Sequence, residues 1–225
     1  MGGGYVSPEQ YVKDKAEFAR KGIARGKSIV AVAYGDGILL LAENPSSTLH
    51  KVSEVYDRIA FAGVGRYNEF EALRVAGIRH SDVKGYAYAR VDVTAKGLAN
   101  MYSQTLGHIF GSPAEKPFEV EVMVAEVGHV PEENQIFKIA YDGTLYAESR
   151  LAAIGGEEDA LAEALERSFE PGAPLSEALG WAKGAFESVA GRTFQVEEWE
   201  GAVVDRTLGR RTFRRLSPDE VGGGS

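Results

Sequence analysis

The sequence predicts an α+β fold in which two antiparallel sheets are stacked and a layer of helices covers each outer face, a four-layer αββα sandwich. Hairpin-like strand patterns come in groups and helix patterns come in pairs. Their order is one helix, four strands, two helices, four strands, two helices and two strands. A parallel sheet would instead need strands and helices to alternate one by one. No internal repeat or linker interrupts the 225 residues, so we expect one domain.

The first helix is predicted from Pro8 to about Gly26. Ser7 can cap this helix, Pro8 suits the first helical position, and Gln10 would complete a capping box. Apolar residues then follow at helical spacing, at Tyr11, Phe18 and Ile23.

Four strands should follow as two hairpins. The first hairpin turns at Gly35-Asp36-Gly37 and the second at Tyr56-Asp57, since small and polar residues there separate β-rich runs. The predicted strands are Ser28–Tyr34, Ile38–Ala42, Val52–Val55 and Arg58–Gly63.

Two helices are predicted next, one from about Tyr67 to Arg79 and one that Thr94 caps. Alternation of apolar and polar residues then marks a second group of strands, with Asp142-Gly143 as a turn. These strands are Phe118–Val124, Gln135–Tyr141, Thr144–Ala147 and Leu151–Ile154. The remaining elements are the helices Glu157–Phe169 and Leu175–Val189 and a strand pair, Ala202–Asp205 with Arg211–Leu216.

Glycine runs occupy residues 2–4 and 222–224. Such runs are typical of engineered flexible segments, so we exclude them from the fold and expect the native ends to have been trimmed. The expected organisation is a flexible segment over residues 1–7, one domain over residues 8–218 and a flexible tail over residues 219–225.

The net charge of −8 argues against nucleic acid and anionic membranes as partners, because both are themselves negative. One arginine cluster could suggest a basic patch, but acidic residues lie close to it in sequence, so we expect a salt-bridged sheet surface. The cluster is Arg210, Arg211, Arg214 and Arg215, and the acids are Glu197, Glu198 and Glu200.

The chain contains no cysteine, which excludes disulfides, zinc–thiolate sites, iron–sulfur clusters and cysteine nucleophiles. Its four histidines have no ligand or triad spacing, so no metal is expected. The longest apolar run, Ile38–Ala42, is too short to span a bilayer, and no secretory signal opens the chain. We therefore expect a cytoplasmic protein.

Two glycine-rich turns lack the residues that a phosphate-binding site requires. Gly63-Val64-Gly65 precedes a helix, but Asn68 stands where a dinucleotide-binding fingerprint needs a third glycine. Gly155-Gly156 is followed by acids and lacks the Lys-Ser/Thr of a P-loop. No cofactor is expected.

Several segments resemble the α-subunits of actinobacterial proteasomes. They occur in the same order and cover nearly the whole chain, residues 5–218. The matching segments are Glu17–Ser28, Leu41–Ser46, Lys51–Arg58, Tyr67–Phe70, Gly85–Tyr88, Asp92–Thr94 and Leu98–Tyr102. The resemblance implies a fold of the N-terminal nucleophile hydrolase type, which agrees with the order of elements above.

The resemblance also implies a place in a larger particle. Proteasome α-subunits form heptameric outer rings that flank rings of proteolytic β-subunits, gate substrate entry and dock ATPase or other activator rings. The implied partners are therefore other α-subunits, β-subunits, activator rings and unfolded protein substrates in transit.

The same resemblance implies that the chain is not an enzyme by itself. In β-subunits an N-terminal threonine is the nucleophile, and its own amine is the base. Alignment places Lys27 at that threonine, Glu43 at the β-type aspartate and Lys51 at the catalytic lysine. A self-sufficient hydrolase of the same fold remains the alternative, which would need an N-terminal nucleophile that the sequence does not offer.

Two candidate sites follow from the resemblance. Lys51, with the backbone of Gly65 nearby, is expected to pair with the terminal carboxylate of an activator tail. The gate is expected at Tyr5, Val6, Ser7 and Pro8. Gly4-Tyr5-Val6 replaces the Tyr-Asp-Arg motif of archaeal and eukaryotic relatives, which bacterial members also lack.

Overall fold

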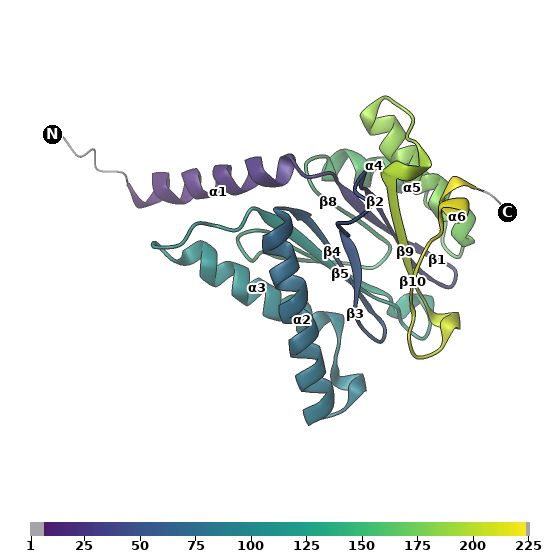
Figure 1. Cartoon of the computed structure of the whole chain (residues 1–225), viewed down its shortest axis with the longest axis horizontal. Coiled ribbons are helices and arrows are strands. Elements are labelled where there is room, and N and C mark those ends of the chain that lie inside the picture. The colour runs from purple at the N-terminus through teal and green to yellow at the C-terminus, as the bar shows by residue number, and fades with distance from the viewer. Residues whose placement is uncertain (1–6, 224–225) are drawn as a thin grey trace.

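The computed structural model describes residues 7–223, and within them two five-stranded antiparallel sheets stack face to face (Figure 1). The first sheet contains, in spatial order, β10 (Phe213–Arg215), β9 (Trp199–Asp205), β2 (Gly37–Glu43), β1 (Ile29–Tyr34) and β8 (Leu151–Ile154). The second sheet contains β3 (Val52–Tyr56), β4 (Ile59–Gly65), β5 (Val120–Glu126), β6 (Gln135–Ile139) and β7 (Leu145–Glu148).

Helices cover both outer faces, so the predicted αββα sandwich is confirmed. The first sheet is covered by α4 (Glu158–Ser168) and α5 (Leu175–Ala190), and the second by α2 (Tyr67–Ala87) and α3 (Ala95–Gly111). The helices α1 (Pro8–Ala24) and α6 (Pro218–Gly222) lie at the two ends of the chain. None of the helices within residues 7–223 has an apolar stretch long enough to cross a membrane.

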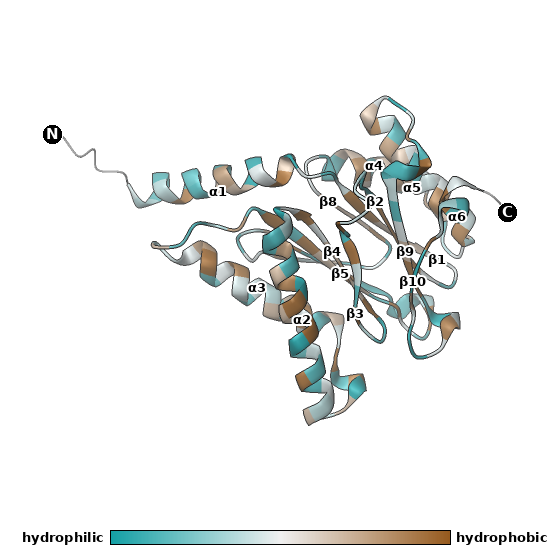
Figure 2. Cartoon of the chain, viewed as in Figure 1, coloured by the Kyte–Doolittle hydropathy of each residue, from teal (hydrophilic) through white to brown (hydrophobic). Residues whose placement is uncertain are grey.

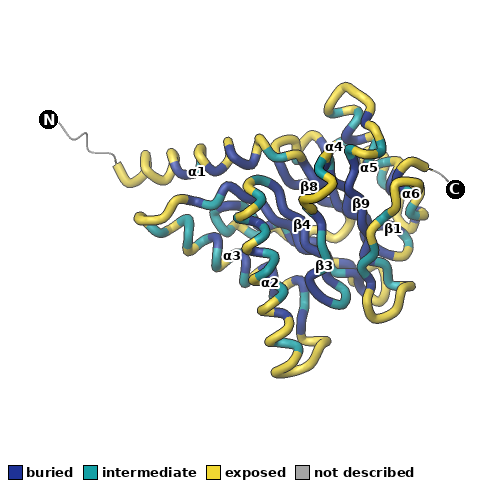
Figure 3. The backbone as a smooth tube through the Cα atoms, viewed as in Figure 1, coloured by how far each residue is buried: buried dark blue, intermediate teal, exposed yellow. Residues whose placement is uncertain are grey.

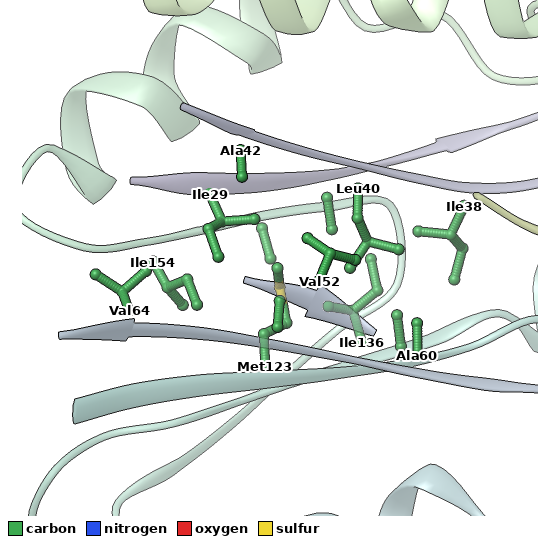
Figure 4. Close-up of a cluster of buried hydrophobic side chains, with 14 of the residues drawn as sticks. Ile29, Ile38, Leu40, Ala42, Val52, Ala60, Val64, Met123, Ile136 and Ile154 are labelled. Atoms are coloured by element: carbon green, nitrogen blue, oxygen red, sulfur yellow. The ribbon is translucent and has the colours of Figure 1, made fainter. Parts of the chain in front are cut away.

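The apolar core has three layers because both faces of each sheet are covered. Between the sheets, Ile29 and Leu40 of one sheet meet Met123 and Ile136 of the other (Figure 4). Alternate residues such as Val30 point the other way and contact the helices. Central strands are therefore apolar on both faces, and Figure 2 shows the apolar residues concentrated on the sheets.

Helix α1 projects from the sandwich, and most of its outer half is exposed (Figures 1 and 3). Its 17 residues span about 25 Å, and its inner half packs through Ala19 and Ile23 against the second sheet. The outer half rests on the end of α3, where Lys15 Nζ donates to the carbonyl oxygens of Phe110 and Ser112, both at 2.8 Å. A cation is favourable there because these carbonyls end a helix.

The start of α1 is confirmed except for its capping box. Gln10 N donates to Ser7 Oγ at 3.2 Å, and Pro8 is the first helical residue. The predicted return bond from the Gln10 side chain is wrong, because its amide donates to Asp14 Oδ1 at 2.6 Å one turn further on.

Helix α2 continues to Ala87 instead of ending near Arg79. Two glycines lie inside this helix, and tertiary contacts require them. A Cβ on Gly77 would lie 1.8 Å from the hydroxyl oxygen of Tyr102, and one on Gly85 would lie 2.0 Å from that of Tyr56. These glycines let two tyrosines pack against the helix, which outweighs their poor helix propensity.

The flexible tail expected from residue 219 is wrong over its first part. Ser217 and Glu220 form a capping box at the start of α6, in which each side chain accepts from the other residue's backbone N–H. Val221 is buried, at 3% exposure. Lys183 Nζ of α5 donates to the Val221 carbonyl oxygen at 2.9 Å. The Ser-Pro start signal was present in the sequence, but the glycine run after it hid the helix.

Three of the four clustered arginines near the chain end are paired with acids, as predicted, and no ion pair of Arg210 is found within residues 7–223. Arg211 bonds Glu54 at 2.6 Å, Arg214 bonds Glu220 at 2.7 Å, and Arg215 bonds Glu200 at 2.8 Å. Of the three acids named from the sequence, Glu200 alone pairs with this cluster; Glu198 pairs with Arg192.

Glu121 of β5 is a carboxyl group buried on the inter-sheet side, at 7% exposure. It borders a polar cavity of about 520 Å³ between α1, β6 and α4. Gly155 N donates to its Oε2 at 2.9 Å, while Lys138 pairs with the neighbouring Glu158 instead. Burial, followed by the charge of Glu158, raises the pKa of Glu121 to about 7.

Glu121→Gln should stabilise the protein at pH 8 but have little effect at pH 5. Between pH 4.5 and 7 the folded state binds more protons at this position than the unfolded state, so the carboxyl's contribution to the free energy of unfolding falls as pH rises. Above pH 7 the carboxylate costs on the order of 1–3 kcal/mol. Thermal denaturation of both proteins at the two pH values measures this effect. The exposed control Glu132→Gln should change neither melting temperature, and an equal change at both pH values for Glu121→Gln would contradict the prediction.

Candidate functional site

The link between α1 and β1 lies against the end of β4. A Cβ on Gly26 would lie 2.7 Å from Val64 Cγ1 and 2.9 Å from Gly65 N, so the backbone approaches β4 more closely than any side chain allows. This contact brings the end of α1 to the residues in which β4 ends.

Gly65 ends β4 in a conformation that favours glycine, with φ +105°. A Cβ there would lie 1.9 Å from the carbonyl oxygen of Glu119. The bare backbone leaves a hollow of about 290 Å³. The residues that line it are Gly22, Arg25, Gly26, Gly65, Arg66 and Glu119. It combines glycine backbone with Arg25 and with an ion pair in which Arg66 Nη1 lies 3.2 Å from Glu119 Oε2.

Lys51 precedes β3 and lies beside the same strand. Its carbonyl oxygen accepts from Gly63 N at 3.0 Å, which puts it across the ladder from the end of β4. Its Nζ donates to the carbonyl oxygens of Lys27 and Glu43, the latter at 3.3 Å. An ammonium has three donors. Within residues 7–223 no third acceptor takes a bond from this Nζ, so one donor is available to an incoming group.

Burial lowers the pKa of Lys51 to about 8, and the charges of Glu200 and Glu43 partly oppose this shift. The positive charge of Lys27 acts in the same direction as burial. The side chain is therefore mostly charged at neutral pH and loses its charge within the range that experiments can reach.

The three residues that the resemblance assigned to β-type catalytic positions lie together. Lys27 Nζ is 3.0 Å from Glu43 Oε1, and Lys51 Nζ bonds the backbone of both residues. Lys27 supplies no hydroxyl or thiol, and α1 precedes it in the chain. The adjacent Ser28 is buried, and its Oγ accepts from Glu157 N at 3.4 Å. Within residues 7–223, no hydroxyl of this cluster is hydrogen-bonded to a base.

Comparison with known proteins supports the resemblance. The model of the proteasome subunit family matches residues 23–204. A protein named proteasome subunit alpha from Streptosporangium roseum is 53% identical over 95% of this chain and 82% of its own length. Its namesake from Kineococcus radiotolerans is 52% identical over 97% of this chain and 95% of its own length. The chain belongs to the proteasome family, as an α-type subunit.

Membership in this family means that the α-type chain assembles with other proteasome subunits. Its exposed apolar side chains are consistent with that. Tyr11, Val12 and Phe18 of α1 are 40–52% exposed, and Tyr86 and Tyr88 at the end of α2 are 95% and 78% exposed. Contact with another subunit would remove the apolar surface of these side chains from water, which is favourable.

The candidate residues of this α-type subunit are only partly brought together. Gly65 ends β4, and Lys51 immediately precedes the neighbouring strand β3 at the same end of the sandwich. Ser7 and Pro8 cap and begin α1, which projects from that end. Tyr5 and Val6 lie outside the described residues. Both site assignments remain predictions.

Sequence reasoning missed Arg25, Arg66 and Glu200. The arginines line the hollow beside Gly65, and Glu200 bonds the backbone of Lys51. For Glu200 a signal was available, since one acid stands inside the apolar strand β9. The arginines carry no such signal because exposed arginines are common.

Proposed function

We propose that this α-type subunit forms the outer heptameric ring of a proteasome core particle, in the cytoplasm, and is itself without catalytic activity. The ring gates the entry of unfolded protein substrates and docks ATPase or other activator rings. The β-subunits carry the proteolysis.

The docking role rests chiefly on the environment of Lys51. Two backbone carbonyls hold its ammonium, one donor remains, and the hollow at Gly65 is at the end of the adjacent strand. A chain end entering there could present its carboxylate to Lys51 and its backbone to the glycines. A charge-assisted hydrogen bond of this kind is strong because the site is partly desolvated.

The gating role rests on α1. This helix starts at Pro8, far from the sheets, and is anchored at both halves by Lys15 and Ile23. The proposed gate residues, Tyr5, Val6, Ser7 and Pro8, are those at which this helix begins or that precede it in the chain.

The purified chain should cleave no peptide, since Lys27 stands at the position of the nucleophile and is paired with Glu43. A fluorogenic peptide assay of the chain alone, and of the chain mixed with β-subunit, tests this. Turnover should appear only in the mixture and should vanish when the N-terminal threonine of the β-subunit is replaced by alanine. Turnover by the chain alone would instead support the self-sufficient hydrolase.

A further inference from the structure

Glu200 is a buried carboxylate at the centre of a hydrogen-bond network. It lies on β9 at 9% exposure, in a strand whose other residues are mostly apolar. Its Oε1 accepts from Val52 N at 3.1 Å and Arg215 Nη1 at 2.8 Å. Its Oε2 accepts from Lys51 N at 2.8 Å and Asn44 Nδ2 at 2.7 Å.

The network joins the two sheets at the docking lysine. Glu200 belongs to the first sheet, while Val52 begins β3 of the second sheet and Lys51 immediately precedes it. Arg215 adds a second link between the sheets, because its Nη2 donates to the Val52 carbonyl oxygen at 2.8 Å. With both amides fixed by one carboxylate, the backbone that carries the Lys51 side chain cannot rotate freely.

The carboxylate also acts on the ammonium through its charge. The charged groups around the Lys51 side chain are Glu200 from β9, Glu43 from β2 and Lys27 from the α1–β1 link. Of the two carboxylates, Glu200 raises the pKa of Lys51 more than Glu43 does. Around Glu200 itself are Arg215 and His50, whose Nδ1 is 3.4 Å from Oε1.

We propose that Glu200 is a positioning residue of the docking site, which fixes the backbone of Lys51 and keeps its ammonium charged. The role rests on the proposed docking function of Lys51, but its electrostatic part can be measured without any activator. Glutamine, which has the same shape but no charge, would keep part of the hydrogen-bond network but would no longer favour the charged form of the Lys51 ammonium.

The first test measures the ionisation of Lys51 directly. Rings of wild type and Glu200→Gln are labelled with trace acetic anhydride between pH 6 and 10, and acetylation of Lys51 is quantified by peptide mass spectrometry. The wild-type midpoint should lie near pH 8, and that of Glu200→Gln should be lower by about half a unit or more. The control Glu54→Gln removes the acid of another arginine pair, on β3, and should leave the midpoint unchanged. An unchanged midpoint in folded Glu200→Gln would overturn the proposal.

The second test measures docking. The probe is a fluorescent peptide of the last ten residues of the proteasomal ATPase from the same organism. As pH is raised, the affinity of the peptide for Glu200→Gln rings should begin to fall at a lower pH than its affinity for wild-type rings. In a Lys51→Arg background the same change should not move the pH profile, because arginine stays charged. A purely structural role would weaken binding equally at every pH and in both backgrounds.

The variant Glu200→Asp distinguishes the effect of side-chain length from the effect of charge. It also provides a test if Glu200→Gln does not fold. The shorter side chain keeps its charge but cannot reach both backbone amides, so the peptide should bind several-fold more weakly at pH 6.5. Wild-type affinity in this variant would contradict the positioning role. Failure of the peptide to bind wild type would refute docking at Lys51, while the labelling experiment would still decide whether Glu200 sets its charge.

Discussion

Replacing Lys51 by alanine should abolish most activator-stimulated degradation while basal peptide cleavage by the assembled core stays unchanged. The change leaves the tail carboxylate unpaired in a partly dry site, at a cost on the order of 2 kcal/mol per site, or about 30-fold in affinity. Several tails bind one ring at once, so the losses multiply through avidity. The measurement compares cores built with wild-type and Lys51→Ala rings, with and without the ATPase.

A conservative variant and the pH profile serve as controls for this result. Lys51→Arg keeps the charge but not the compact geometry, so it should rescue docking only in part. Docking needs the protonated amine, whose pKa is about 8, so wild-type stimulation should be complete near pH 6.5 and decline as pH rises through 8. The Lys51→Arg ring should lack that decline. If Lys51→Ala cores respond to the ATPase as wild type does, the docking role assigned to Lys51 is wrong.

A double change, Tyr86→Ser with Tyr88→Ser, should prevent most of the assembly with other proteasome subunits. These tyrosines lie at the end of α2, a part of the chain that is largely exposed (Figure 3). Val83 of α2 and Val91, in the short turn that follows, are 68% and 84% exposed. Tyrosines buried at an interface contribute about 2 kcal/mol each, so the loss at every subunit contact should be large. Native mass spectrometry, with and without β-subunit, would count rings and free chains.

The matched control for this surface is the double variant Tyr86→Phe with Tyr88→Phe, which keeps the apolar area. It should assemble nearly as well as wild type if burial of that area drives the contact. Normal assembly of the serine variant would show that this end of α2 faces solvent in the particle. Neither change should affect the folding of the chain, because both side chains are exposed and make none of the described core contacts.

Local patterns were sufficient to predict the architecture. Period-two runs, turn residues such as Gly35-Asp36-Gly37 and caps such as Thr94 act over a few residues, so their physical meaning does not depend on the rest of the fold. The capping box at Gln10 failed for a local reason, its bond to Asp14, but two other errors arose where a distant contact changed the balance. The glycines of α2 are tolerated because tyrosines from elsewhere need the space, and α6 packs on α5 despite its glycine ending.

The residues of the site divide in the same way. Lys51 and Gly65 could be named in advance because the chain as a whole resembles a known family. Their surroundings could not be predicted, since Glu200 is 149 residues from Lys51 in the chain and reaches it only because the two sheets stack. The pKa of Lys51 likewise depends on burial and on charges from β2, β9 and the α1–β1 link. The sequence was therefore sufficient for the family and the layers, whereas the hydrogen bonds and the charge of Lys51 arise where distant strands meet.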